Sequence, residues 1–180
     1  MAITTGMRRG ELLALHWADV DLDGGYVQVR FTLQHTSGES YYFAQPKTKS
    51  SKRKVALTGV AIEALRRHRQ RQQEQAEMLG EAWRDEDLVF TNPIGEAMRG
   101  NYLLQRHFAP LLKRAGLPAI RFHDLRHTAA TLMLRQRIHP KVVSEMLGHS
   151  QIGITLGAYS HVLPDMQQEA VQALDKLLGE

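Results

Sequence analysis

The stretch from Arg121 to His161 constrains the fold of this chain more than any other part of the sequence. It reads RFHDLRHTAATLMLRQRIHPKVVSEMLGHSQIGITLGAYSH, and its apolar residues recur at helical spacing. The segment HDLRHTAATLMLRQR predicts an amphipathic helix, and a second helix opens at Pro140 and ends before Gly148. A short run, ITLGAY, follows and ends at Tyr159. The stretch therefore predicts two helices followed by a short run that ends at Tyr159.

The same stretch carries residues that suit chemistry on a phosphate ester. Arg126 can hold phosphate oxygens through its planar guanidinium. His123 and His149 can donate or accept protons near neutral pH. His123 and Arg126 are three residues apart and so share one helix face. Tyr159 can act as a covalent nucleophile.

Two other interpretations compete for these residues. His123 and His127 have the i, i+4 spacing of a zinc helix, but the acid between them is the short Asp124 and no third ligand is evident. A packing or supporting role is therefore favoured for His127. Residues 134–158 can also be interpreted as a DNA-binding helix-turn-helix.

The rest of the chain predicts helices and strands in mixture. Helices are expected over 7–17, from an N-cap at Thr58 to about Leu79, over 101–115 with an interruption at Pro110, and over 164–178. Alternating, β-branched or aromatic runs predict strands over 26–33, 40–45 and 54–58. The segment ADVDLDGG is expected as a turn, and PKTKSSKR as a basic hairpin loop. The predicted fold class is α+β, mostly α-helical with a small three-stranded antiparallel sheet.

Length and composition are those of one globular domain. The chain has 180 residues, 43% of them hydrophobic and 23% charged, and it has no cysteine. No apolar run reaches the length of a membrane span, and the N-terminus lacks the apolar core of a signal peptide. A cytoplasmic location is therefore expected.

The distribution of charge points to a polyanionic partner. Residues 47–71 hold nine Lys or Arg and one acid, and residues 97–144 hold nine and one. The segment between them, 73–96, holds seven acids and one Arg. Basic blocks separated by acidic ones predict a positive face and a neutral or negative face, which suits nucleic acid.

Four blocks of sequence, in order, resemble the catalytic domain of the tyrosine recombinase (phage integrase) family. They are TGMRRGELLALHWADVDL, PKTKSSKRKVALT, HDLRHTAATL and LGHSQIGITLGAYSHV. The resemblance implies the fold of that family and spans nearly the whole chain. It also implies that residues 1–180 form a single catalytic domain that is truncated at its N-terminus and lacks the family's N-terminal DNA-binding domain. Weak, poorly specific DNA binding by this chain alone is the corresponding expectation.

The resemblance assigns roles to individual residues. Arg8 and Arg126 would clamp the phosphate, His149 would hydrogen-bond it, His123 would transfer a proton, and Tyr159 would be the nucleophile. The general-acid lysine would lie in the hairpin, where Lys47 matches best and Lys49 is the alternative; Glu11 would orient the site. Gly157 stands where many relatives have Asp. Further candidate DNA-contacting residues are Arg9, Lys49, Lys52 and Arg53.

The implied activity is site-specific DNA recombination or integration through a 3′-phosphotyrosine intermediate. Two guanidiniums can stabilise the charge of the transition state, so no metal or other cofactor is expected. The implied partner is double-stranded DNA, bound by a homotetramer in which helix 164–178 docks on a neighbouring subunit. The alternatives are relaxation of DNA by a type IB topoisomerase-like enzyme and a non-catalytic helix-turn-helix module.

Overall fold

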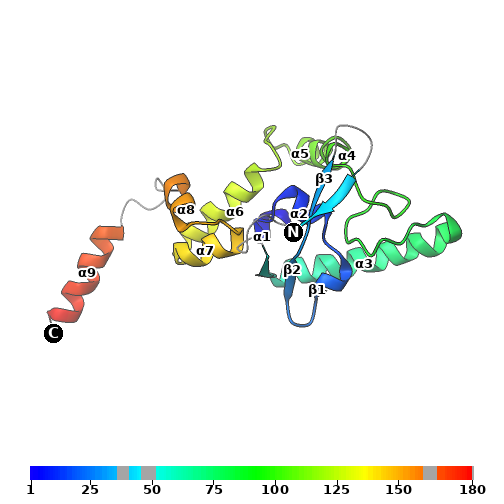
Figure 1. Cartoon of the computed structure of the whole chain (residues 1–180). Helices are drawn as coiled ribbons and strands as arrows, with labels where there is room; N and C mark the ends of the chain where they lie inside the picture. The colour runs from blue at the N-terminus through cyan, green and yellow to red at the C-terminus, as the bar shows by residue number, and fades with distance from the viewer. Residues whose placement is uncertain (36–40, 46–51, 160–165, 180) are drawn as a thin grey trace.

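The computed structural model describes residues 1–35, 41–45, 52–159 and 166–179. Two short N-terminal helices, α1 (Ala2–Thr5) and α2 (Arg9–Leu13), lie at the centre of the molecule. Most of the strands and the helix α3 (Gly59–Leu79) lie on one side of them, and α6 (Asp124–Arg135), α7 (Pro140–Leu147) and α8 (Ile152–Tyr159) lie on the other (Figure 1). The expected class, α+β and mostly helical, is confirmed.

Helix α2 is shorter than the helix predicted over residues 7–17. It ends at Leu13, and a 3-10 turn, η1 (Trp17–Asp19), follows. The backbone between them pairs instead with the extended segment that precedes Val89. The Trp17 amide donates to the Asp87 carbonyl at 2.7 Å, and the Val89 amide donates to the Leu15 carbonyl at 2.8 Å. These long-range bonds replace the helical ones, so α2 stops early.

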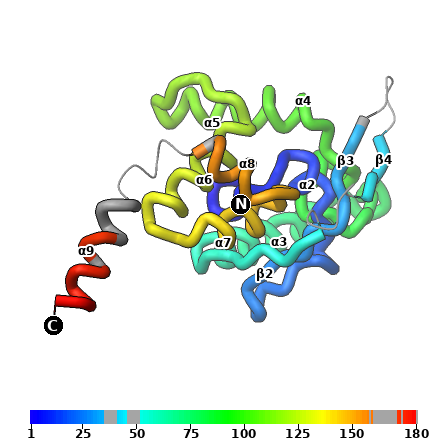
Figure 2. Tube along the Cα trace, turned by 60° about the vertical axis from the view of Figure 1, so that its left-hand side comes forward, coloured from blue at the N-terminus to red at the C-terminus, as the bar shows by residue number. Residues whose placement is uncertain are grey.

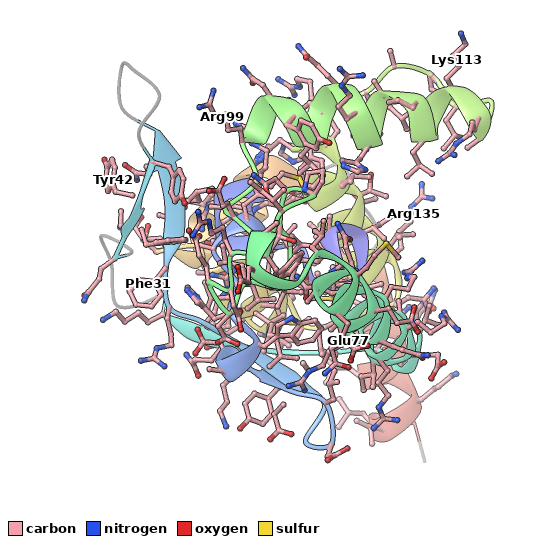
Figure 3. All side chains as sticks on the ribbon, turned by 90° about the vertical axis from the view of Figure 1, so that its right-hand side faces the viewer. Phe31, Tyr42, Glu77, Arg99, Lys113 and Arg135 are labelled. Carbon is pink, nitrogen blue, oxygen red and sulfur yellow. The ribbon has the colours of Figure 1, made fainter. Side chains whose placement is uncertain are left out.

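The three-stranded antiparallel sheet has the order β1-β2-β5, and its members differ from those predicted. β1 (Val20–Asp21) comes from the segment expected as a turn, and it pairs with β2 (Tyr26–Val29). β5 (Arg53–Ala56) pairs with β2 on the other side, with Val27 opposite Val55. A separate two-stranded ribbon is formed by β3 (Thr32–His35) and β4 (Tyr41–Ala44). Figure 3 shows Tyr42 of this ribbon pointing away from the molecule.

The predicted strand 26–33 is split because its two halves pack in different cores. Val27 and Val29 are buried in the cluster that contains Leu12 and Leu65. Leu33 belongs to a second cluster with Leu13 and Leu88. At the break, the exposed Arg30 pairs with the buried Asp19 carboxylate at 3.1 Å. A single straight strand cannot pack its side chains into both clusters. The alternation of buried and exposed side chains therefore continues over two separate strands, β2 and β3.

The long helix α3 (Gly59–Leu79) begins as predicted, because the Thr58 hydroxyl accepts a hydrogen bond from the Ala61 amide. It continues into the 3-10 turn η3 (Gly80–Ala82). Its contacts with the body include polar ones: Gln72 accepts from the Trp17 indole at 2.7 Å, and a His68 ring nitrogen lies 2.6 Å from the Val89 carbonyl.

The helical segment 100–114 runs through Pro110 without the predicted interruption. It comprises α4 (Gly100–Tyr102), a π-helical segment η4 (Leu103–Phe108) and α5 (Ala109–Arg114). Proline lacks an amide hydrogen and crowds the carbonyl four residues back. The wider π turn gives the ring room, so the irregularity precedes Pro110. Figure 3 shows Arg99 near the start of this segment and Lys113 near its end, both projecting outward.

The C-terminal part contains the two expected helices, α6 (Asp124–Arg135) and α7 (Pro140–Leu147), and the run ITLGAY lies in a further helix, α8 (Ile152–Tyr159). Pro140 opens α7 and Gly148 closes it with a φ of 68°, as predicted. The last helix, α9 (Met166–Leu178), stands apart from the body in both views (Figures 1 and 2). None of the helices in the described ranges combines the length and the apolar character that crossing a membrane requires.

Candidate active site

Arg126 is the most deeply buried cation of the C-terminal helices. It projects from α6 with 4% of its surface exposed, and its Nη1 donates to the Gly6 carbonyl at 2.8 Å. Gly6 can present that carbonyl because it ends α1 in the left-handed conformation, with a φ of 62°. The second terminal nitrogen, Nη2, is buried and has no hydrogen-bond partner among the described residues. Burial lowers the pKa of Arg126 to about 10, and the charge of Arg8 acts in the same direction. The Arg126 side chain therefore stays charged at neutral pH, and its Nη2 group can still donate a hydrogen bond to a ligand.

Arg8 lies at the start of α2, where Glu11 fixes it through both its backbone and its side chain. The Arg8 amide donates to Glu11 Oε2 at 2.9 Å, and Arg8 Nη1 donates to Glu11 Oε1 at 2.8 Å. Arg8 Nη2 donates to the Gly148 carbonyl at 3.3 Å. The Arg8 side chain is 41% exposed, so solvent or a ligand can reach it.

Arg53 is the second arginine bound to Glu11. Its Nη1 and Nη2 donate to the two carboxylate oxygens at 3.2 and 3.0 Å, and its Nε donates to the Met146 carbonyl at 2.7 Å. Burial alone would raise the pKa of Glu11, but the hydrogen bond and charge of Arg53, with Arg8, outweigh burial and lower it. The Arg53 side chain is 7% exposed. Its position makes it part of the scaffold under Arg8, and a contact between Arg53 and DNA stays a prediction.

The turn after α7 brings His149 to the same place. Gly148 allows the turn, and a Cβ there would lie 2.7 Å from Arg53 Nη1, so the backbone passes directly over this guanidinium. A ring nitrogen of His149, Nδ1, lies 2.8 Å from the Thr155 hydroxyl. Burial lowers the pKa of His149 to about 4, and the charges of Arg126, Arg8 and Arg53 contribute. The imidazole is therefore neutral at pH 7.

Tyr159 ends α8 with only 4% of its surface exposed. Its hydroxyl oxygen lies 2.8 Å from Nδ1 of His127 on α6. Burial raises the pKa of Tyr159, and the charge of Arg126 opposes that effect. Thr155 and Tyr159 are four residues apart, so they share one face of α8. That face therefore carries both the tyrosine and the hydroxyl that contacts His149. Tyr159 also packs in a small core with Ala130, Leu134, Val143 and Leu147.

A cleft of about 760 Å³ adjoins these residues, between the start of α6 and the 100–114 helical segment. His123 and Arg126 line one side of it, and Arg9 and Lys113 also contribute cations. The His123 ring packs edge-on against His127, with ring centroids 4.9 Å apart. Burial lowers the pKa of His123, and the nearby His127 and Arg126 act in the same direction.

A second pocket of about 320 Å³ lies beside His149 and includes Lys52, Arg53 and Lys141. Lys52 and Arg53 are the residues of the basic segment PKTKSSKR that the structure describes. Lys52 is exposed, and its Nζ donates to Gln45 at 3.1 Å. Lys47 and Lys49, the candidate general acids, lie outside the described residues. No group of three metal-binding side chains occurs among those that are described.

The structure thus brings Arg8, Glu11, Arg126, His123, His149 and Tyr159 into one region, from segments far apart in sequence. Three further contributors were not foreseen in these positions: Arg53 holds Glu11, Thr155 holds His149, and His127 contacts Tyr159. One signal in the sequence indicated the burial of Arg53. Arg53 and Val55 are two residues apart in a strand, so they share one face of β5, and that face is buried.

The sequence comparison settles the family. The model of the phage integrase family matches residues 1–166. The chain belongs to the phage integrase family.

Individual relatives agree with this membership. A tyrosine recombinase XerC-like protein of Caldanaerobacter subterraneus subsp. tengcongensis is 36% identical over 188 residues, which cover 98% of this chain and 48% of the relative. The ICEBs1 integrase of Bacillus subtilis is 30% identical over 178 residues, which cover 99% of this chain and 48% of that protein. This phage integrase family chain therefore spans about half the length of these curated relatives.

Solved structures show the same fold. The Tn1549 transposon integrase, in complex with circular intermediate DNA, matches with a TM-score of 0.79 and 25% identity. The match covers 96% of this chain and 57% of that one. The expected phage integrase fold is confirmed.

Proposed function

We propose that this chain is the catalytic domain of a site-specific DNA recombinase or integrase that cleaves and rejoins DNA through a tyrosine. Family membership supports this proposal. The observation that carries it is the buried Arg126 guanidinium, whose Nη2 lacks a partner among the described residues. An unpaired buried donor is unfavourable, and a phosphate oxygen is a strong acceptor that would satisfy it.

The phosphodiester is proposed to lie between Arg8 and Arg126. Arg8 remains accessible and is fixed by Glu11, which itself is held by Arg53. Preorganised donors stabilise a transition state because they need no rearrangement as charge develops. His149, neutral through burial and the arginine charges, adds a hydrogen bond from its ring. His123 faces the cleft and supplies proton transfer there.

In the proposed step, the Tyr159 oxygen gives its proton to a neighbouring histidine and attacks the phosphorus. The bond from phosphorus to the 5′ oxygen breaks, and a 3′-phosphotyrosine forms. The departing 5′ oxygen takes a proton from a lysine of residues 46–51, with Lys47 as the first candidate and Lys49 as the second. The new ester retains the bond energy of the old one, so a 5′ hydroxyl of another strand can attack it without ATP.

Double-stranded DNA is the proposed partner, with Arg9 and Lys52 as further contacts. Solved relatives bound to DNA support this choice. We also propose that the full-length protein assembles as a homotetramer in which α9 docks on a neighbour. Large apolar side chains of α9 are exposed: Val171 at 57%, Leu174 at 54%, Leu177 at 76% and Leu178 at 82%. Such a face is typical of a protein interaction site.

The test uses the chain with a pool of nicked duplexes of random sequence. Cleavage beside a nick releases a short strand and traps the covalent product, which is detected as a protein–DNA band after denaturation and mapped by mass spectrometry. We expect an adduct on Tyr159 that disappears in Tyr159→Phe and persists in Tyr42→Phe, a control at an exposed tyrosine. An adduct that survives Tyr159→Phe contradicts the proposal.

The same assay separates the alternatives. Salt-sensitive DNA binding without any covalent product would favour a non-catalytic DNA-binding module. Relaxation of supercoiled DNA without strand exchange would favour a topoisomerase-like activity. Sequenced junctions from the full-length protein would identify strand exchange and its target.

A further inference from the structure

The hydrogen bond between His127 and Tyr159 links two residues that are 32 positions apart in sequence. Nδ1 of His127 lies 2.8 Å from the Tyr159 hydroxyl oxygen, and the two ring centroids are 5.9 Å apart. Both elements, α6 and α8, lie on the same side of the molecule (Figure 1). From this geometry we infer that His127 is a further catalytic residue, the general base that takes the proton of Tyr159. The inference rests on the function proposed above.

The surroundings of Tyr159 create a need for such a base. A phenol has a reference pKa of about 10, so it is mostly protonated at neutral pH. Burial in the core with Leu134 and Leu147 raises the pKa of Tyr159 further, against the opposing charge of Arg126. An imidazole within hydrogen-bond distance is the group that most often performs this proton transfer in enzymes.

His127 meets the geometric requirement more directly than His123 does. In the described part of the chain, the hydrogen-bond partner of the Tyr159 hydroxyl is His127. His123 instead presents its ring edge-on to His127 and lines the phosphate-side cleft with Arg126. His123 is also a weak base there, because burial, His127 and Arg126 lower its pKa. The two histidines thus face different reacting groups.

The proton balance of the step is simple. Nδ1 accepts the phenolic proton, so the His127 ring must begin with its single proton on Nε2 and becomes an imidazolium. The tyrosine oxygen forms its bond to phosphorus as the 5′ oxygen departs. His127 is exposed on the surface of α6, so water can take up the proton from Nε2 afterwards. In the rejoining direction the ring first takes up a proton from water, and the imidazolium then gives its Nδ1 proton to the departing phenolate.

One measurement tests the starting state without DNA. Nitrogen-15 NMR of the histidine-labelled chain at about pH 8 distinguishes the two neutral ring forms. The His127 signals are identified by their loss in His127→Asn. We expect a bare Nδ1 and a proton on Nε2. A proton on Nδ1 would make His127 the donor to Tyr159, unable to take its proton, and would overturn the inference.

A second measurement tests the step itself, as the single-turnover rate of adduct formation on the nicked duplexes. Asparagine places an amide near the position of Nδ1, so His127→Asn can keep a hydrogen bond to Tyr159 but cannot accept a proton. We expect His127→Asn and His127→Ala both to slow cleavage by about 100-fold or more, the usual range for a lost general base. His107→Asn, which changes an exposed histidine on the 100–114 segment, should retain the wild-type rate.

Chemical rescue separates a base from a merely structural contact. Because His127 is exposed, free imidazole can enter the space left in His127→Ala, and it should restore the rate by about tenfold or more. Wild-type speed in His127→Asn, or no rescue of a folded His127→Ala, would overturn the inference. If the wild-type chain formed no adduct, the proposed function would fail, and the NMR result alone would still decide whether Nδ1 can accept the proton.

Discussion

At the scale of single residues, Glu11 connects the two arginines that support the site. Its carboxylate is 3% exposed and binds Arg53 and Arg8. We predict that Glu11→Gln lowers the free energy of unfolding by about 3–5 kcal/mol, because it leaves the buried Arg53 charge uncompensated. Urea denaturation measures this change. Glu63→Gln, which breaks the exposed pair with Arg67, is the control and should stay within about 0.5 kcal/mol. Equal losses in the two variants would argue against a special role for the buried pair.

His149 gives the fold a second residue-level dependence, on pH. Its pKa falls from 6.5 in an unfolded chain to about 4 in the folded one. The unfolded chain therefore binds the proton more tightly, and protonation favours unfolding. Stability should be unaffected by His149 above pH 6.5, decrease as the pH falls from 6.5 to 4, and decrease no further below that. Because the ring is only half-buried, solvent screening reduces the effect to about 1–2 kcal/mol.

The measurement compares urea denaturation of the wild type and His149→Gln at several pH values in this window. His123 also has a lowered pKa, so the wild type alone does not isolate His149. The variant should lose part of the acid sensitivity and keep the remainder. An identical pH dependence in both proteins would show that His149 does not have a lowered pKa in the folded state.

At the scale of elements, the turn after α7 packs against the two arginines that bind Glu11. Gly148 has a positive φ, and a Cβ there would press on Arg53. Gly116 has a similar φ of 64° but open space around it. We predict that Gly116→Ala costs about 1 kcal/mol of stability through backbone strain alone. Gly148→Ala should cost at least about 1 kcal/mol more, because Arg53 must move away from Glu11. Denaturation curves for the two variants measure that difference, and equal costs would contradict the contact.

The elements also show how far sequence reasoning reaches. Helices with local start and stop signals, such as the N-cap at Thr58 and the pair Pro140 and Gly148, were predicted correctly because these signals act within a few residues. The split of the strand 26–33 was not predicted, because it depends on two separate hydrophobic clusters. The same limit explains why the contacts of Arg53 with Glu11 and of His127 with Tyr159 were not predicted. Their partners lie 42 and 32 residues away, and only folding brings them together.

At the scale of the whole molecule, the cations around the larger cleft should govern DNA binding. Arg9 and Lys113 both line it, and neither belongs to the proposed phosphate clamp. We predict that Arg9→Gln and Lys113→Gln each reduce the slope of log K against log salt by about 1, as expected for one lost phosphate contact. Arg67→Gln removes the same charge from α3, where Arg67 pairs with Glu63, and should leave the slope unchanged. Fluorescence anisotropy titrations at several salt concentrations measure the slopes. Equal changes in all three variants would indicate that net charge, rather than the cleft, controls binding.

The last helix makes a separate prediction about assembly. Because the apolar residues of α9 are exposed, they contribute little to the stability of the isolated chain. Val171→Glu and Leu174→Glu should therefore change the free energy of unfolding by less than about 1 kcal/mol. Met78→Glu is the control, since Met78 is 84% exposed but lies on α3. On DNA, we expect the unmodified chain to form larger complexes that sedimentation resolves, and the two α9 variants should lose them because a buried carboxylate in a docked interface is unfavourable. The α3 control should keep these complexes. Normal assembly by the α9 variants would show that this helix does not join subunits, and a large loss of stability would show that it packs on its own domain.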